Sequence, residues 1–172
     1  MQNGNSVYNE GIVDVGILVV AIFENPLKEQ AVKFLSDVLR QKKRAAIPLT
    51  TVLGAYHIAT RYLKLKRINV KHVLDKLLTT RSPALYPNIT PELASRALDL
   101  ATYYNIESWD GYIVALAKNI GNSIIYSLDK ELEKTREVTV INPFPEHLTK
   151  QYHNFVKKLL KNQNETNNHH SQ

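Results

Sequence analysis

The sequence contains no cysteine among its 172 residues. That absence excludes disulfide bonds, thiolate metal sites and cysteine nucleophiles together, and it suits a reducing compartment. No signal peptide is evident at the N-terminus, where a basic region followed by an apolar region is missing. The longest apolar run, Gly16 to Phe23, is too short to span a bilayer. We therefore expect a cytoplasmic protein with no membrane segment.

Acidic residues are missing from one long stretch. Between Val38 and Leu74 there is no Asp or Glu, although the chain carries a formal net charge of +6. The same stretch contains nine basic residues, which are Arg40, Lys42, Lys43, Arg44, Arg61, Lys64, Lys66, Arg67 and Lys71. Such a segment is typical either of a solvated basic surface or of contact with a phosphate backbone. Composition alone leaves both interpretations open.

Two common nucleotide-binding motifs are also absent. The chain has no G-x-x-x-x-G-K-[ST] loop and no G-x-G-x-x-G after its first strand, which disfavours ATPases and dinucleotide-binding enzymes. Its length and its 44% content of hydrophobic residues suit a single domain with a proper core. Internal repeats and linkers are not evident.

Short apolar segments alternate with amphipathic ones. The patterns predict strands at 11–15, 44–47, 123–126 and 138–141, and longer helices at 27–41, 50–63, 69–79, 90–104, 108–120 and 144–161. Strands separated by helices indicate a parallel sheet. We expect a three-layer α/β/α domain over residues 10–161, with a mostly parallel sheet of four to five strands and a C-terminal helix at 144–161. Residues 1–9 are expected to be a flexible lead and residues 162–172 a disordered tail.

Three aspartates fall where such a sheet would bring them together. Asp14 ends the first strand, Asp110 lies in the first turn of a helix, and Asp129 follows the 123–126 strand. Ligands bind at the carboxyl edge of open α/β sheets. Three neighbouring carboxylates repel one another unless a cation neutralises them, and Mg²⁺ or Mn²⁺ prefers such oxygen ligands. The pattern favours metal-assisted phosphodiester hydrolysis, whereas a structural interpretation makes each aspartate a helix or turn cap.

The order of these motifs resembles the PIN domain, the nuclease fold of VapC-type toxins and related ribonucleases. The resemblance covers Gly11 to Pro143 and depends on IVDVG, IPLTTVLGAYH, ESWDGYIVALAKNIG and IIYSLDKEL followed by INP. It implies a nuclease that uses one or two Mg²⁺ or Mn²⁺ ions to cut single-stranded RNA. By position, the metal-binding and catalytic residues are Asp14, Asp110 and Asp129. Ser127 matches the hydroxyl residue two places before the last aspartate.

Two positions depart from the family pattern. The usual glutamate in the helix after the second strand is replaced by Gly54, and the polar residue two places after the first aspartate is replaced by Gly16. His57 and Glu107 are candidate replacements, although a helical histidine is commonly structural and an acid at a helix start favours the dipole. Two functions stay open: an active ribonuclease, or a degenerate PIN domain that binds RNA or protein with weak or no nuclease activity.

The nuclease interpretation also predicts contacts and partners. Arg61, Lys64, Lys66 and Arg67 are expected to steer the RNA backbone. Tyr56 or Trp109 can stack on an unpaired base, although aromatic residues more commonly pack in the core. The resemblance does not separate a toxin, which would have an antitoxin as its partner, from a housekeeping ribonuclease. The 144–161 helix can form a homodimer or cover its own sheet edge, and we favour the second.

Overall fold

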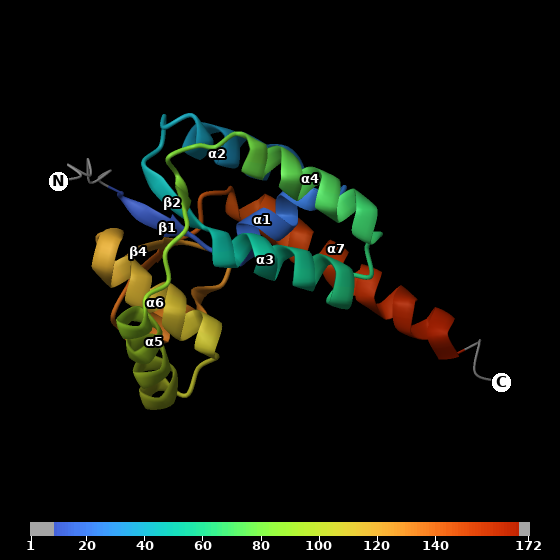
Figure 1. The fold of residues 1–172 in the computed structure, drawn as a ribbon. Helices are drawn as coiled ribbons and strands as arrows, with labels where there is room; N and C mark the ends of the chain where they lie inside the picture. The colour runs from blue at the N-terminus through green and yellow to red at the C-terminus, as the bar shows by residue number, and fades with distance from the viewer. Residues whose placement is uncertain (1–8, 169–172) are drawn as a thin grey trace.

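The computed structural model describes residues 9–168 and shows a parallel sheet between two layers of helices (Figure 1). Within these residues the sheet has five strands in the order β3-β2-β1-β4-β5. Their bounds are β1 Gly11–Val13, β2 Ala45–Pro48, β3 Leu85–Tyr86, β4 Ile124–Tyr126 and β5 Thr139–Ile141. The predicted three-layer α/β/α fold is confirmed.

The helices follow the predicted order along the chain. They are α1 Val15–Ile22, α2 Lys28–Leu39, α3 Leu49–His57, α4 Arg67–Thr79, α5 Pro91–Tyr104, α6 Ser108–Ile120 and α7 Glu146–Asn168. A π-helical turn, η1 Ile58–Tyr62, continues α3, and a 3₁₀ helix, η2 Lys130–Thr135, connects β4 to β5. None of the helices in residues 9–168 is both long enough and apolar enough to cross a membrane.

The central strand is β1, which pairs in parallel with β2 on one side and β4 on the other. Ile12 is the register partner of both Ala46 and Ile125, and it is fully buried. The chain places β2 and β3 on one side of β1 and then crosses to the other side of β1 for β4 and β5. The strand order therefore reverses between β1 and β4, and at such a point the carboxyl ends of two strands open onto a shared edge.

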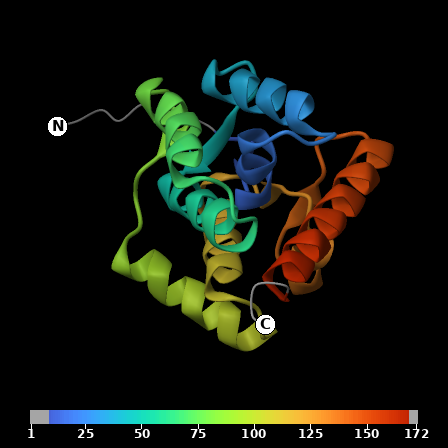
Figure 2. The ribbon, with the colours of Figure 1, turned by 90° about the vertical axis from the view of Figure 1, so that its right-hand side faces the viewer.

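Each face of the sheet has its own core. One face is covered by α1 to α4 and α7, with Ile17, Val38 and Val70 fully buried in that core. The other face is covered by α6, whose Ile113 and Leu116 pack against the sheet, and α5 covers α6 in turn. In Figure 2, α7 runs along one side of the molecule and α5 along its base.

Gly111 sets the spacing between α5 and α6. A Cβ atom at this position would lie 2.2 Å from the carbonyl oxygen of Ala97, far inside contact distance. A glycine is therefore needed for the two helices to approach this closely. Because this packing fixes the rotation of α6 about its own axis, it also fixes the direction of Asp110, the preceding residue.

Three segments differ from the sequence prediction. The segment 82–88, for which the patterns predict neither a strand nor a helix, contains β3, which gains its extended form by pairing with β2. The helix expected at 50–63 changes to a π-helical turn after His57. The last helix, expected to end at 161, continues to Asn168, so residues 162–168 of the expected disordered tail are helical. Gln163 in this extension donates a 2.9 Å hydrogen bond to the Leu63 carbonyl oxygen. The remainder of the tail and residues 1–8 of the lead lie outside the described residues.

Candidate active site

Asp14 lies at the carboxyl end of β1 and is buried. Its Oδ1 accepts a 2.7 Å hydrogen bond from the Val15 N–H, which caps α1. Its Oδ2 accepts a 2.6 Å hydrogen bond from the Ser127 hydroxyl. Burial raises the pKa of the Asp14 carboxyl, although these two hydrogen bonds lower it. Asp14 is therefore both the cap that the structural interpretation predicted and a carboxylate held in one orientation at the sheet edge.

Ser127 connects two of the predicted aspartates. It follows β4 and is almost fully buried. While its hydroxyl donates to Asp14, it also accepts a 3.0 Å hydrogen bond from the Asp129 N–H. The Asp129 side chain is exposed and accepts a 2.8 Å hydrogen bond from the Glu131 N–H at the start of η2. The hydrogen bonds of Ser127 thus connect the carboxyl end of β1 with the loop that follows β4.

Ser127→Ala is expected to lower the free energy of unfolding by about 1–3 kcal/mol, because it leaves a buried carboxylate oxygen and a backbone N–H without their partner. Urea unfolding monitored by circular dichroism measures this change. Ser108→Ala, at an exposed serine of the same sheet edge, is the matched control and is expected to change stability little. Equal unfolding midpoints for Ser127→Ala and the wild-type protein would contradict the role assigned to this hydroxyl.

Asp110 lies in the first turn of α6 and is half-buried. Burial raises the pKa of its carboxyl to about 6, and the negative charges of Asp14, Asp129, Glu107 and Glu131 add to the shift. The three aspartates therefore lie close enough for their charges to act on one another. Glu131 was not identified from the sequence, and its signal was its place two residues after Asp129 in SLDKEL.

Among residues 9–168, Asp14, Asp110 and Asp129 have no basic partner, whereas the neighbouring Glu131 pairs with Lys134 at 2.9 Å. The ion pairs found within residues 9–168 include none of the three aspartates. In the same part of the chain, no three His, Cys, Asp or Glu side chains are arranged to hold a metal ion by themselves. The available donors are carboxylate and hydroxyl oxygens, which suit hard cations. Mg²⁺ keeps several of its waters and binds through one or two carboxylates, so the donor set fits a hydrated hard cation.

Gly54 lies on the side of α3 that faces the start of α1. A Cβ atom at this position would meet Val15 Cγ2 at 3.3 Å and no other atom within 4 Å. Val15 directly follows Asp14, so the Cβ atom of a side chain at position 54 would contact the residue next to Asp14. At Gly16, no atom lies within 4 Å of the corresponding Cβ position. Both departures from the family pattern therefore leave space rather than a substitute side chain.

The two candidate replacements differ in their surroundings. His57 is exposed, and its ring meets the edge of the Tyr62 ring at a centroid distance of 5.7 Å. This contact directs His57 toward the π-helical turn. Glu107 is the N-cap residue of α6, and its charge contributes to the raised pKa of Asp110. Of the two, Glu107 is the residue that acts on the aspartates.

The basic segment divides into two groups. Arg61, Lys64, Lys66 and Arg67 are exposed in the connection from α3 to α4, at the far end of the helix that leaves the aspartate edge (Figure 1). The residues from Arg40 to Arg44 lie at the opposite edge of the sheet, where the Arg44 carbonyl oxygen accepts from the Glu10 N–H. Lys43 in this second group covers the rings of Phe34 and Tyr126.

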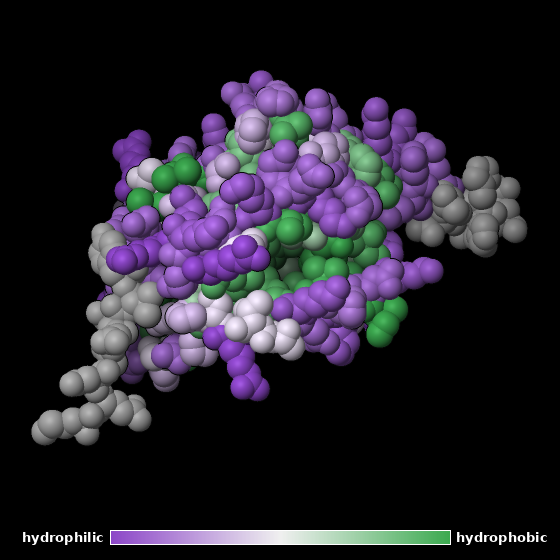
Figure 3. All heavy atoms as spheres, turned by 90° about the horizontal axis from the view of Figure 1, so that it is seen from above, coloured by the Kyte–Doolittle hydropathy of each residue, from purple (hydrophilic) through white to green (hydrophobic). Residues whose placement is uncertain are grey.

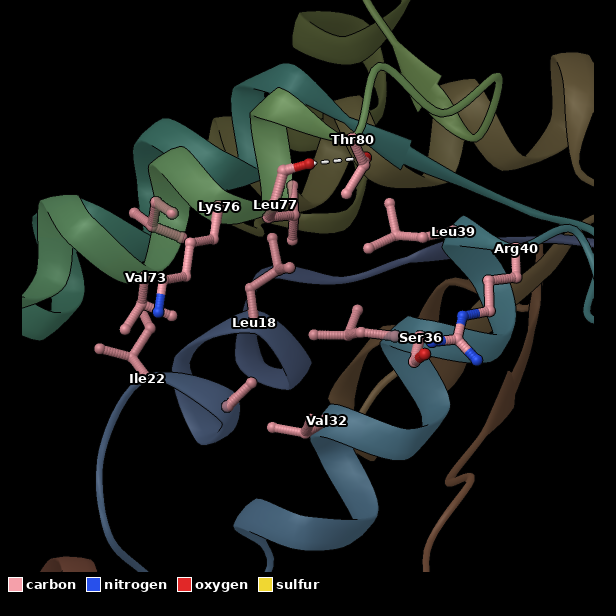
Figure 4. A pocket seen from close by; sticks show the side chains of 13 residues that line it. Leu18, Ile22, Val32, Ser36, Leu39, Arg40, Val73, Lys76, Leu77 and Thr80 are labelled. Atoms are coloured by element: carbon pink, nitrogen blue, oxygen red, sulfur yellow. Dashed lines mark hydrogen bonds between the residues drawn. The ribbon is translucent and has the colours of Figure 1, made fainter.

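A separate hollow lies between α2 and α4, with α1 as its floor, and is visible as an apolar patch in Figure 3. Its volume is about 490 Å³, and Leu18, Ile22, Leu39, Val73 and Leu77 contribute to its walls (Figure 4). None of its lining residues among those described is acidic. It lies on the face of the sheet opposite α5 and α6, so this hollow contributes nothing to the chemistry of the aspartates.

The chain matches the model of a known family. The family model described as PIN domain matches residues 12–138. This span contains the three aspartates, Ser127 and Gly54. No curated protein matches the chain at a significant level.

Proposed function

The chain belongs to the PIN domain family, and from this membership we propose that it is a divalent-metal-dependent endoribonuclease acting on single-stranded RNA. PIN domains are generally nucleases. The observation that carries the proposal is the group of Asp14, Asp110 and Asp129 at the sheet edge, where their charges act on one another and no basic residue of the described part of the chain pairs with them. The direct test is cleavage of unstructured RNA that requires Mg²⁺ or Mn²⁺ and stops on addition of EDTA.

The three aspartates are the proposed contacts of the cation, directly or through the waters that it keeps. When bound, Mg²⁺ or Mn²⁺ supplies water activation and neutralises charge on the phosphoryl oxygens. The protein contributes orientation: two hydrogen bonds hold Asp14 in place, and Ser127 fixes the start of the loop that carries Asp129. Asp110 is mostly ionised at neutral pH because the pKa of its carboxyl is about 6. Glu107 is a secondary candidate ligand, and the contact between His57 and Tyr62 gives His57 less support.

The exposed residues Arg61, Lys64, Lys66 and Arg67 are the proposed contacts for the RNA backbone. Replacing Lys66 and Arg67 together by alanine should reduce the slope of log affinity against log salt by about 1.4, because each phosphate contact with a single strand contributes about 0.7. Fluorescence anisotropy of a labelled oligonucleotide at several salt concentrations measures the slope. The matched control replaces Arg40 and Lys42, two exposed basic residues at the opposite edge. Equal effects of the two double variants would contradict this assignment.

A second candidate function is a degenerate PIN domain that binds RNA or protein without efficient cleavage. Gly54 favours it, because the helix position that normally carries a fourth acid has no side chain. RNA binding with unchanged RNA length in the presence of Mg²⁺ and Mn²⁺ would support this second function. A metal-dependent loss of full-length RNA supports the first.

A ribonuclease of this family can serve as a VapC-type toxin or as a housekeeping enzyme. A VapC-type toxin requires a cognate antitoxin, so inhibition of cleavage by the product of a neighbouring gene would support that role over a housekeeping ribonuclease. Location in the cytoplasm follows from the proposed RNA substrate and stays a prediction. A homodimer stays a prediction as well: α7 packs on its own domain, where Tyr152 is buried and contacts Phe23.

A further inference from the structure

Trp109 is the chain's single tryptophan, and 63% of its surface is exposed. It is the second residue of α6 and directly precedes Asp110. Tryptophan is strongly buried on average in folded proteins, so a largely exposed one next to a candidate ligand has to be explained. Neither the fold nor the proposed metal ligands account for it.

The position of Trp109 follows from the packing of α6. Residues three and four places apart share a helix face, so Trp109 lies on the face that carries Tyr112, Ile113 and Leu116. Those three side chains are at most 4% exposed and belong to the core between α6 and the sheet. Trp109 lies one turn before these residues, where the helix extends beyond the edge of the sheet. Trp109 therefore continues the buried stripe of α6 beyond the sheet, on the turn that carries Asp110.

The helix α3 provides a second exposed apolar residue. Tyr112 lies close enough to Thr50, in the first turn of α3, for this hydroxyl to affect the pKa of the phenol. Thr50 Oγ1 is nevertheless buried without a well-aligned hydrogen-bond partner among the described residues. One turn further along α3, Leu53 is 73% exposed. Trp109 and Leu53 are thus exposed apolar side chains on α6 and α3. Both helices begin at the aspartate edge (Figure 1).

We propose that Trp109 is a base-stacking residue, on which an unpaired base of the RNA lies while the neighbouring phosphate occupies the aspartate edge. This inference rests on the proposed nuclease function. The edge carries Asp14, Asp110, Asp129 and Glu107, whose carboxylates have no ion pair among the described residues, so it repels the phosphate backbone until a cation binds. A contact with the uncharged face of a base is not subject to that repulsion. Stacking is also tolerant of sequence, because every base has a π-face.

The single tryptophan provides a direct probe of this contact. The intrinsic fluorescence of the full chain is titrated with an unstructured eight-nucleotide RNA, once in EDTA, which prevents metal-dependent cleavage, and once in Mg²⁺, with the signal read immediately after mixing. A matched sugar-phosphate chain without bases is the control ligand. We expect the RNA to quench Trp109 fluorescence and the abasic chain to bind without quenching, because the quenching arises from the base.

Three variants distinguish the loss of the Trp109 ring from a loss of folded structure. Trp109→Leu is expected to weaken RNA binding about 10-fold, since stacking of one base contributes enough free energy for a change of this size. Trp109→Phe keeps an aromatic face and should retain most of the affinity. Leu98→Ala, at an apolar residue of α5 that is 59% exposed, is the control and should leave binding unchanged. All three variants should melt within a few degrees of the wild-type protein, because these side chains are exposed.

The outcomes distinguish this inference from the nuclease proposal. RNA that binds and is cut without quenching Trp109, together with unchanged affinity of Trp109→Leu, would overturn the stacking role and leave the nuclease intact. Quenching and a 10-fold loss in Trp109→Leu, without cleavage under any metal, would support stacking and reject the nuclease. Absence of RNA binding in EDTA and in Mg²⁺ alike would overturn both.

Discussion

Asp110→Asn is expected to reduce metal-dependent RNA cleavage at least about 100-fold, because it removes a negatively charged ligand at the centre of the acidic group. A divalent cation contributes several kcal/mol to phosphoryl transfer, and each 1.36 kcal/mol corresponds to a tenfold change in rate. Asparagine has nearly the same shape as aspartate, so the packing of α6 against α5 and the sheet should be preserved. Initial rates of cleavage of a labelled RNA measure the effect.

The same substitution should stabilise the metal-free protein above pH 6. The Asp110 carboxyl has an ordinary pKa of 3.8, and burial and the neighbouring acids raise the folded-state pKa to about 6. The folded protein therefore binds the proton more tightly, and its stability falls as the pH rises through this window and stays lower above it. Asparagine removes that loss. We expect a gain of roughly 1 kcal/mol at pH 7.5, a value reduced for the partial solvent exposure of the side chain.

The control for Asp110 is Asp99→Asn, at an exposed aspartate on α5. It should leave both cleavage and the free energy of unfolding close to their wild-type values. Urea unfolding in EDTA at pH 4 and pH 7.5 gives the comparison, and the gain of Asp110→Asn should be confined to the higher pH. A large loss of stability in Asp110→Asn at both pH values would show that this residue is a structural cap.

Gly54→Glu is expected to tighten binding of Mn²⁺ or Mg²⁺ about 10-fold or more, because it adds an acid where the family normally has one. The structure allows this, since the new Cβ would meet only Val15 Cγ2, at 3.3 Å, a contact that a shift of a few tenths of an ångström relieves. Glycine is also a poor helix residue, so replacing it gains up to about 1 kcal/mol in α3. Isothermal titration calorimetry with Mn²⁺ measures the affinity.

Two control variants separate these effects. Gly54→Ala reports the gain in helix propensity together with the contact to Val15. Gly54→Gln adds a side chain of the same length without the charge. Only Gly54→Glu should show a larger increase in melting temperature on addition of Mn²⁺, because a tighter ligand stabilises the folded state further. Equal Mn²⁺ affinity of the glutamate and glutamine variants would show that position 54 does not face the cation.

Much of the fold could be predicted from local patterns. The buried strands are short apolar runs, and the start of α5 is predicted by Thr90 and Pro91, whose role is confirmed by the hydrogen bond from the Leu93 N–H to the Thr90 hydroxyl. β3 could not be predicted, because two residues have no periodicity and its extended form depends on pairing with β2. The end of α7 was misjudged because polar composition at 162–168 resembles a disordered tail, whereas Gln163 is held by a contact with Leu63, 100 residues away in sequence.

The site was predictable where its residues follow strands or begin helices. The sequence places Asp14 and Asp129 after strands and Asp110 in a first turn, and a parallel sheet then assigns them to one edge. The sequence does not show which way each side chain points or how far it is exposed. The contact that turns His57 toward Tyr62, the effect of Glu131 on the pKa of Asp110 and the exposure of Trp109 all depend on tertiary packing.

The central claim is that the three aspartates, without an acid at position 54, support metal-dependent cleavage of RNA. Its most direct test incubates a panel of unstructured RNAs with the wild-type protein in Mg²⁺, Mn²⁺ or EDTA, beside Asp110→Asn and Asp99→Asn purified in parallel. We predict cleavage by the wild-type protein and Asp99→Asn that requires the cation, and no cleavage by Asp110→Asn. Intact RNA in every metal, or equal cleavage by Asp110→Asn, would contradict the claim.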